Sequence, residues 1–213
     1  MLEHLHNIAS GRIFIVGTGA SLLTQIPTLK KLKKEVTFGI NGLVQWDDLP
    51  FTPTYYSIGV LWRLPYADQL KKTKLFVTWN EDPGDDKWTW VPRIASRHRS
   101  MLDNPIQGFG KSFGTMPTAR TAPLTMIQVA AWMGYREFYL VGVELSAEGH
   151  CYSPKDVHRQ GRLNPAIIEN AVMLRAEVEA NGGSLVDCSV GGELRSVLEH
   201  RSLEEVLVVG KKP

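Results

Sequence analysis

The chain has 213 residues, of which 43% are hydrophobic and 22% charged, and its formal net charge is +2. This composition is typical of a folded soluble protein and excludes disordered and fibrous classes. The small net charge gives no reason to expect nucleic-acid binding. No apolar run approaches the ~20 residues of a membrane span, and the N-terminal residues do not resemble a signal peptide. The two cysteines, Cys151 and Cys188, form no disulfide framework, so a reduced, cytoplasmic setting is predicted.

Segments typical of strands and helices alternate along the chain, which predicts a parallel sheet covered by helices. The strands are expected at 12–16, 36–40, 54–58, 75–79, 137–142 and 184–187, and the helices at 21–34, 63–72, 121–133, 164–180 and 202–207. We therefore predict a single α/β domain over residues 1–213, with a Rossmann-like, doubly wound, mainly parallel sheet and helices on both faces. Residues 80–116 interrupt the alternation, and we expect an irregular lid or substrate-loop excursion over the carboxyl edge of the sheet.

The first expected strand runs directly into a glycine turn, Gly17-Thr18-Gly19-Ala20-Ser21. The two glycines let the backbone turn tightly and approach a ligand closely. Ser21 can cap the helix that follows, and the N-terminus of that helix favours an anion. A strand-to-helix turn without any ligand has the same pattern about as often. The turn favours a phosphate or nucleotide ligand without naming the reaction.

The residues after this turn exclude two familiar nucleotide sites. Leu22 stands where an NAD fingerprint needs a third glycine, and the second strand ends in Asn41-Gly42 instead of an acidic residue. No Gly-Lys-Ser/Thr follows the turn, which excludes a P-loop. An asparagine side chain both donates and accepts, so Asn41 suits a sugar hydroxyl, a base edge or a phosphate oxygen.

Two residues are candidates for a general base. Glu144 follows the strand at 137–142, at the end where ligands of α/β proteins bind; it could equally be a solvated carboxylate. His158 lies in a polar loop and could accept a hydroxyl proton, although a loop histidine without a role is nearly as common. The spacing of His150, Cys151 and His158 fits no closed zinc site, so no metal site is predicted.

A basic stretch precedes the helix at 121–133, and only Asp103 opposes it. Such a cluster would neutralise a diphosphate leaving group, and a merely solvated basic face is the alternative. Among these residues we prefer Arg120, because it directly precedes the helix. The stretch consists of Arg93, Arg97, Arg99, Lys111 and Arg120.

The block from Thr121 to Leu145, together with the glycine turn and Asn41, resembles a superfamily with two branches. One branch is the Rossmann-like bacterial sialyltransferases. The other is the MptE-like (DUF115) proteins, which include archaeal 6-hydroxymethylpterin diphosphokinases and many proteins regarded as glycosyltransferases. The tail from Ala180 to Leu194 is also similar to the MptE-like set. The likeness covers most of the chain outside roughly residues 60 to 115.

The resemblance implies roles for individual residues. Tyr152 matches one of two tyrosines that assist a leaving phosphate in the sialyltransferases, whereas Ser146 stands in the place of the other. The catalytic histidine expected before the last long helix is out of register, with Asn164 near its position and His158 upstream. By the same matching, the nucleotide site would be lined by Thr18, Gly19, Ser21, Asn41 and Thr121.

These observations together predict a nucleotide-dependent transferase. The first hypothesis is a sialyltransferase-like glycosyltransferase for surface glycan synthesis, which moves a sugar from a CMP- or UDP-linked donor to a glycan or alcohol acceptor. The alternatives are an ATP- and Mg²⁺-dependent diphosphokinase of the 6-hydroxymethylpterin type and a catalytically inactive nucleotide-sugar binding module. No permanently bound cofactor is predicted, and a homo-oligomer is left open. The predicted site residues are Gly17, Thr18, Gly19, Ser21, Asn41 and Thr121 for the nucleotide and Arg120, Glu144, Tyr152 and His158 for catalysis.

Overall fold

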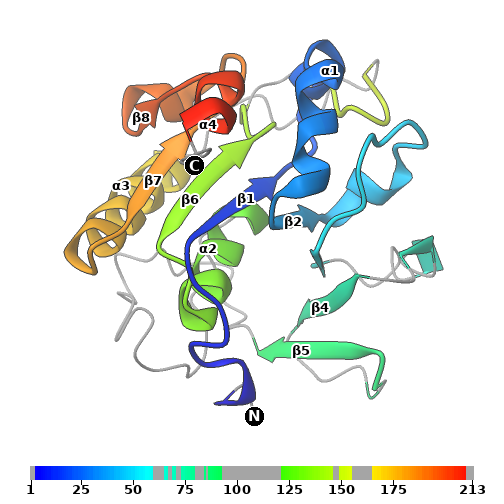
Figure 1. Ribbon diagram of the computed structural model, residues 1–213, viewed down its shortest axis with the longest axis vertical. Helices are drawn as coiled ribbons and strands as arrows, with labels where there is room; N and C mark the ends of the chain where they lie inside the picture. Colours follow the sequence, from blue (N-terminus) through cyan, green and yellow to red (C-terminus); the bar gives the residue numbers. More distant parts are fainter. Residues whose placement is uncertain are drawn as a thin grey trace.

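A parallel sheet organises the part of the chain that the computed structural model describes: residues 3–59, 65–66, 69–70, 73–79, 84, 86–92, 121–145, 149–154 and 165–209. Its eight strands follow the order β5-β4-β3-β2-β1-β6-β7-β8, and each neighbouring pair is parallel (Figure 1). The strands are β1 (Arg12–Val16), β2 (Thr37–Ile40), β3 (Tyr55–Ile58), β4 (Lys74–Trp79), β5 (Trp88–Pro92), β6 (Glu137–Val141), β7 (Ser184–Asp187) and β8 (Glu199–His200). The strand order reverses between β1 and β6, as in a doubly wound sheet.

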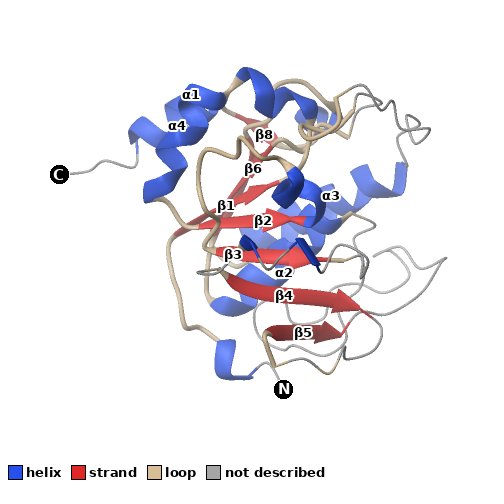
Figure 2. Cartoon of the chain, turned by 90° about the vertical axis from the view of Figure 1, so that its right-hand side faces the viewer, coloured by secondary structure: helices blue, strands red, loops and turns tan. Residues whose placement is uncertain are grey.

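Helices cover both faces of this sheet (Figure 2), which confirms the predicted fold class. One face carries α2 (Ala122–Met133) and α3 (Pro165–Ala180), and the other carries α1 (Ile26–Leu29) and α4 (Leu203–Val209). The described residues also form short 3₁₀ helices: η1 (Glu3–Leu5), η2 (Ala20–Thr24), η3 (Lys30–Lys34), η4 (Asn41–Gln45) and η6 (Glu193–Ser196). None of the helices described is both long and apolar enough to cross a bilayer.

The residues of β1 divide between the two faces because successive side chains of a strand point in opposite directions. Ile13 and Ile15 pack in the cluster with α2 and α3, whereas Phe14 and Val16 pack in the cluster with α1 and α4. A strand that is buried on both faces has a continuous apolar sequence. That is why the run from 12 to 16 predicted β1 correctly.

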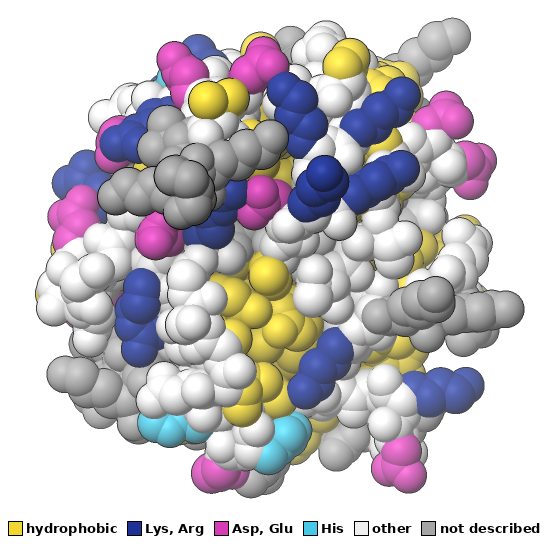
Figure 3. Space-filling model, viewed as in Figure 1, with side chains coloured by type: hydrophobic (Ala, Val, Ile, Leu, Met, Phe, Trp, Pro, Cys, Tyr) yellow, Lys and Arg dark blue, Asp and Glu magenta, His cyan; other side chains and the backbone are white. Residues whose placement is uncertain are grey.

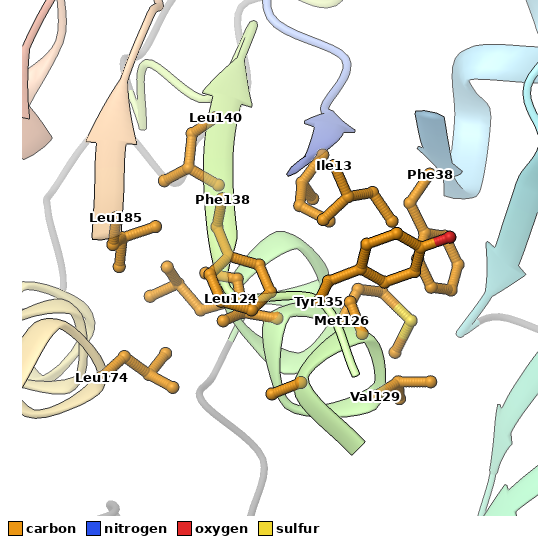
Figure 4. Packing of buried hydrophobic residues seen from close by; sticks show 14 of the residues in the cluster. Ile13, Phe38, Leu124, Met126, Val129, Tyr135, Phe138, Leu140, Leu174 and Leu185 are labelled. Atoms are coloured by element: carbon orange, nitrogen blue, oxygen red, sulfur yellow. The ribbon is translucent and has the colours of Figure 1, made fainter. Parts of the chain in front are cut away.

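Helix α2 is buried on nearly every side. Every residue from Pro123 to Met133 is buried. Its sheet side meets the cluster in Figure 4, where Leu124 lies beside Phe138. Its carboxyl end is covered by the N-terminal segment, because the His6 ring stacks on Trp132 with centroids 4.0 Å apart.

The helix predicted over 21–34 is wrong, because the structure divides this segment into η2, α1 and η3. Pro27 explains the division: its ring would clash with the carbonyl of Leu23 in a continuous helix, and it has no amide to donate. The last turn of the segment is basic, with Lys31, Lys33 and Lys34 in η3. Figure 3 shows lysine and arginine side chains gathered over this part of the molecule, at the upper right.

A second difference lies inside the stretch predicted to be irregular. Residues Trp88–Pro92 form β5, which pairs with β4 at the edge of the sheet. Aromatic and β-branched residues such as Trp88 and Thr89 favour strands, and the surrounding acidic and glycine residues hid this pattern. Proline is tolerated in an edge strand. The rest of 80–116 lies almost entirely outside the described residues, as does most of the helix predicted over 63–72.

Candidate functional site

The glycine turn after β1 lies directly against the chain that leaves β6. The amide of Gly17 donates to the carbonyl of Val141 at 2.8 Å, and the amide of Gly19 donates to the carbonyl of Gly142 at 2.9 Å. A Cβ at position 17 would overlap the Gly142 carbonyl oxygen. The glycines are therefore needed for the close approach of two strand ends. Because the Gly17 and Gly19 amides pair within the protein, neither is available to donate to an anion.

Glu144 fills the space that a side chain at position 19 would need. Its residue is only 5% exposed, and a Cβ built on Gly19 would overlap its carboxylate. The Ser21 hydroxyl donates to Oε1 of the same carboxylate. The predicted role of Ser21 as a helix cap is therefore wrong. Ser21 lies within η2, and the N-cap residue of η2 is Gly19, which makes no side-chain hydrogen bond. The structure brings three predicted site residues together here.

The loop after β7 supports Glu144 from the other side. The Val143 amide donates to Ser189 Oγ at 2.9 Å, and the Ser189 amide donates to Asp187 Oδ1 at 3.0 Å. Gly192, with φ of 90°, packs so closely on the Glu144 backbone that a Cβ there would overlap it. Burial raises the pKa of Asp187, while the Ser189 bonds and His200 partly oppose this shift. The backbone of Val143 and Glu144 is therefore held by the loop after β7.

Residues 149–154 cover the third side of the turn. The Cys151 amide donates to the Thr18 carbonyl at 2.9 Å, and His150 forms antiparallel bridges with both Gly19 and Ser153. Thr18 Oγ1 lies 2.9 Å from Nδ1 of His150. The rings of His150 and Tyr152 stack with centroids 4.9 Å apart and an interplanar angle of 20°. The sequence thus placed Tyr152 at the site but missed His150, because no local pattern reveals a partner 132 residues away.

Cys151 lies between His150 and Tyr152 in the sequence, and its side chain is buried. Burial raises the pKa of its thiol to about 12, and the Glu144 carboxylate adds to the shift. The thiol therefore stays protonated near neutral pH. A protonated, buried thiol is a poor nucleophile, so the role of Cys151 is hydrophobic packing.

Asn41 lies at the carboxyl end of β2, beside the turn that follows β1. Its φ is 50°, a conformation that asparagine adopts more easily than most residues. Its Oδ1 accepts the Gly59 amide at 2.9 Å, and its carbonyl accepts the Tyr56 hydroxyl at 2.8 Å. The side chain is half-buried. Asn41 therefore joins the ends of β2 and β3.

The remaining predicted residues divide into two groups. Thr121 is the N-cap residue of α2, and its carbonyl accepts both the amide and the hydroxyl of Thr125, at 3.1 and 2.9 Å. Arg120 and His158 lie outside the described residues. Within the described ranges, no three His, Cys, Asp or Glu side chains gather to hold a metal ion.

Two solved structures share this fold. The sialyltransferase CstII from Campylobacter jejuni, in complex with the substrate analogue cytidine-5'-monophosphate, matches 90% of this chain and 85% of that chain with a TM-score of 0.55 and 14% identity. The sialyltransferase CST-II in complex with a trisaccharide acceptor and CMP matches 89% and 85%, with a TM-score of 0.56 and 13% identity.

At this identity the likeness shows the fold. No model of a known protein family matches the chain, and no curated protein is significantly similar to it in sequence. The sialyltransferase-like fold is thus confirmed, whereas the resemblance to the MptE-like proteins stays a prediction.

Proposed function

We propose that this chain is a nucleotide-dependent transferase, and specifically a glycosyltransferase that uses a nucleotide-sugar donor. The observation that carries the proposal is the position of the polar side chains. Those of Thr18, Ser21, Glu144, His150 and Tyr152 are linked by contacts around one glycine turn. That turn lies where the strand order reverses, which is the usual ligand position in open α/β sheets.

The choice of donor is supported by the shared fold. The two sialyltransferase structures of this fold contain CMP, and one also contains a trisaccharide acceptor. We therefore propose a CMP-linked sugar as the first donor, a UDP-linked sugar as the second, and a glycan or alcohol as the acceptor.

The donor would lie along the turn and the neighbouring strand end. Thr18 and Asn41 offer half-buried polar side chains on the two adjacent strand ends, suited to ribose hydroxyls and phosphate oxygens. Thr121 begins α2, a twelve-residue helix whose N-terminal end favours a phosphate.

The leaving phosphate needs hydrogen-bond donors as negative charge develops on it. Tyr152 is half-buried, and its stacked ring is fixed against His150, so its phenol can supply one such donor. We propose Arg120 as the second, from its position directly before α2 in the sequence.

Glu144 was one of two candidates for the base, with His158. Its burial and its contacts with Gly19 and Ser21 favour a positioning role. A carboxylate that accepts from Ser21 while touching the turn holds Thr18 and Gly19 in place for the donor. We therefore propose that Glu144 orders the turn.

A thermal-shift panel tests the function. CMP, UDP, GDP and ATP, each with and without Mg²⁺, are compared, because a ligand at a hundred times its Kd stabilises the native state by about 2.7 kcal/mol. We expect stabilisation by CMP or UDP without Mg²⁺ and release of the sugar from the matching donor. Tyr152→Phe should lower turnover about tenfold or more. Tyr139→Phe is the control, since its hydroxyl contacts Glu137 at the other end of β6.

The other outcomes separate the alternatives. Stabilisation by ATP only when Mg²⁺ is present would favour the diphosphokinase. Nucleotide binding without donor hydrolysis or transfer would favour the inactive binding module. Failure of all four nucleotides to stabilise the chain would contradict the proposal.

A further inference from the structure

We propose that His150 is the catalytic base of this site, which takes the proton from the acceptor hydroxyl, and that Thr18 is the positioning residue for its ring. This inference rests on the proposed transferase function. It begins with the backbone, because His150 pairs with Gly19 on one side and with Ser153 on the other. A histidine held by two bridges beside the glycine turn is fixed at the switch point of the sheet.

The side chain is fixed as well as the backbone. Thr18 Oγ1 lies 2.9 Å from Nδ1, and the Tyr152 ring stacks on the imidazole at 4.9 Å. Neutral imidazole carries its proton on one nitrogen and a lone pair on the other. When Nδ1 donates to the threonine oxygen, Nε2 keeps the lone pair. The proposed base is this tautomer, in which the Thr18 oxygen accepts from Nδ1, and the residue is half-buried.

The neighbouring titratable groups are less suited to this step. Glu144 is 5% exposed and accepts from Ser21. The Cys151 thiol is kept neutral because burial raises its pKa to about 12. Tyr152 stacks on the imidazole and is assigned to the leaving phosphate. Among the described residues around this turn, His150 is then the group best suited to accept a proton at neutral pH.

The step balances as a nucleophilic substitution at the sugar. Nε2 of His150 takes the acceptor's hydroxyl proton while the acceptor oxygen forms its bond to the anomeric carbon of the donor. The bond from that carbon to the phosphate oxygen breaks, and its electron pair stays on the nucleoside monophosphate or diphosphate. The imidazolium then returns its proton to solvent, so no metal, oxidant or further reactant is consumed.

Kinetics of His150→Gln, with His4→Gln as the matched control, test the assignment. His4 lies in η1 at the N-terminal end, away from the carboxyl ends of β1 and β6 (Figure 1). We expect His150→Gln to lower kcat at least about 100-fold and to remove the acidic limb of the pH profile. The Kd for CMP, measured by calorimetry, should change less than about threefold, because a base contributes to the reaction step and not to donor binding. His4→Gln should match the wild type in all three measurements.

Thr18 is tested by a pair of variants. Thr18→Val removes the oxygen that meets Nδ1, and we expect about a tenfold loss of kcat and a displaced acidic limb. Thr18→Ser keeps that oxygen and should restore the wild-type profile. A merely structural role for Thr18 would leave the pH profile where it is in both variants.

Two failures have distinct signatures. If the wild type transfers sugar and a folded His150→Gln or His150→Asn variant keeps kcat and the acidic limb, the assignment of His150 is overturned while the transferase function stands. If the wild type binds neither CMP nor UDP, the proposed function and the inference are both overturned. Thermal midpoints of the variants within a few degrees of the wild type establish that they are folded.

Discussion

Two turns at the same edge of the sheet are fixed in different ways. The turn after β1 is held by residues far away in sequence, since Ser21 meets Glu144 and Thr18 meets His150 at separations of 123 and 132 residues. The turn after β2 is held locally, because Asn41 bonds to Tyr56 and to Gly59, only 15 and 18 residues away. A ligand at the first turn would therefore be coupled to the loops that follow β6. The turn after β2 needs no contact with the loops that follow β6 for the hydrogen bonds of Asn41.

The largest expected effect comes from crowding the first turn. In Gly17→Ala the new Cβ would overlap the Gly142 carbonyl, and backbone cannot yield as a flexible side chain can. We expect a loss of about 3 kcal/mol in the free energy of unfolding, measured by urea denaturation. Gly182→Ala is the matched control: its φ is +75° and nothing lies within 4 Å. The control should show only left-handed backbone strain, of about 1 kcal/mol. Equal losses of unfolding free energy in the two variants would show that Gly17 is not packed closely against the Gly142 carbonyl.

The second turn should respond to loss of a single hydroxyl. The Tyr56 oxygen accepts the Val44 amide at 2.6 Å and donates to the Asn41 carbonyl at 2.8 Å. Tyr56→Phe removes both of these hydrogen bonds, so we expect it to cost about 2 kcal/mol. Tyr139→Phe should cost less, since its contact with Glu137 is longer, at 3.3 Å, and only part-buried. If both variants unfold at the wild-type urea midpoint, the turn after β2 does not depend on the hydroxyl.

The parts of the molecule that local sequence determines were predicted well. The apolar run of β1 and the helix α3 with its following glycines needed no knowledge of distant partners. The helix over 21–34 was predicted wrongly because Pro27 was given too little weight. The position of Glu144 after a strand end was predicted from the sequence, whereas the contact of Ser21 with it was missed. That contact, like the one between Thr18 and His150, depends on how β1 and β6 come side by side, and no local pattern encodes this.

Asp187, the last residue of β7, should make stability depend on pH. The pKa of Asp187 is raised by burial, so the folded state holds its proton more tightly than the unfolded chain does. The stabilisation from the protonated form is complete below the unfolded pKa of about 4, and it is lost as pH rises through the folded pKa. Asp187→Asn keeps an acceptor for the Ser189 amide and cannot ionise. We expect the variant's unfolding free energy to gain on that of the wild type as pH rises from about 4 to 7.

Urea titrations at several pH values check this dependence. Asp47→Asn is the control, because Asp47 is exposed and its replacement should leave the slope of stability against pH close to that of the wild type. If the difference between Asp187→Asn and the wild type is the same at pH 4 and pH 7, Asp187 does not titrate as its burial implies.

The smallest effect on stability is expected for Asn41→Asp. This variant also tests whether Asn41 contacts the donor or only joins β2 and β3. Aspartate also tolerates a left-handed backbone, and its Oδ1 can still accept the Gly59 amide, so we expect a change below about 0.5 kcal/mol in unfolding free energy. A negative charge facing the donor phosphate should weaken CMP binding about tenfold, or about 1.4 kcal/mol. Asn7→Asp is a close match, because Asn7 has φ of 52° and lies in the N-terminal segment, against α2. Calorimetry with CMP should separate the two variants. If both bind CMP as the wild type does, Asn41 only joins two strands, and the donor lies wholly on the side of β1 and β6.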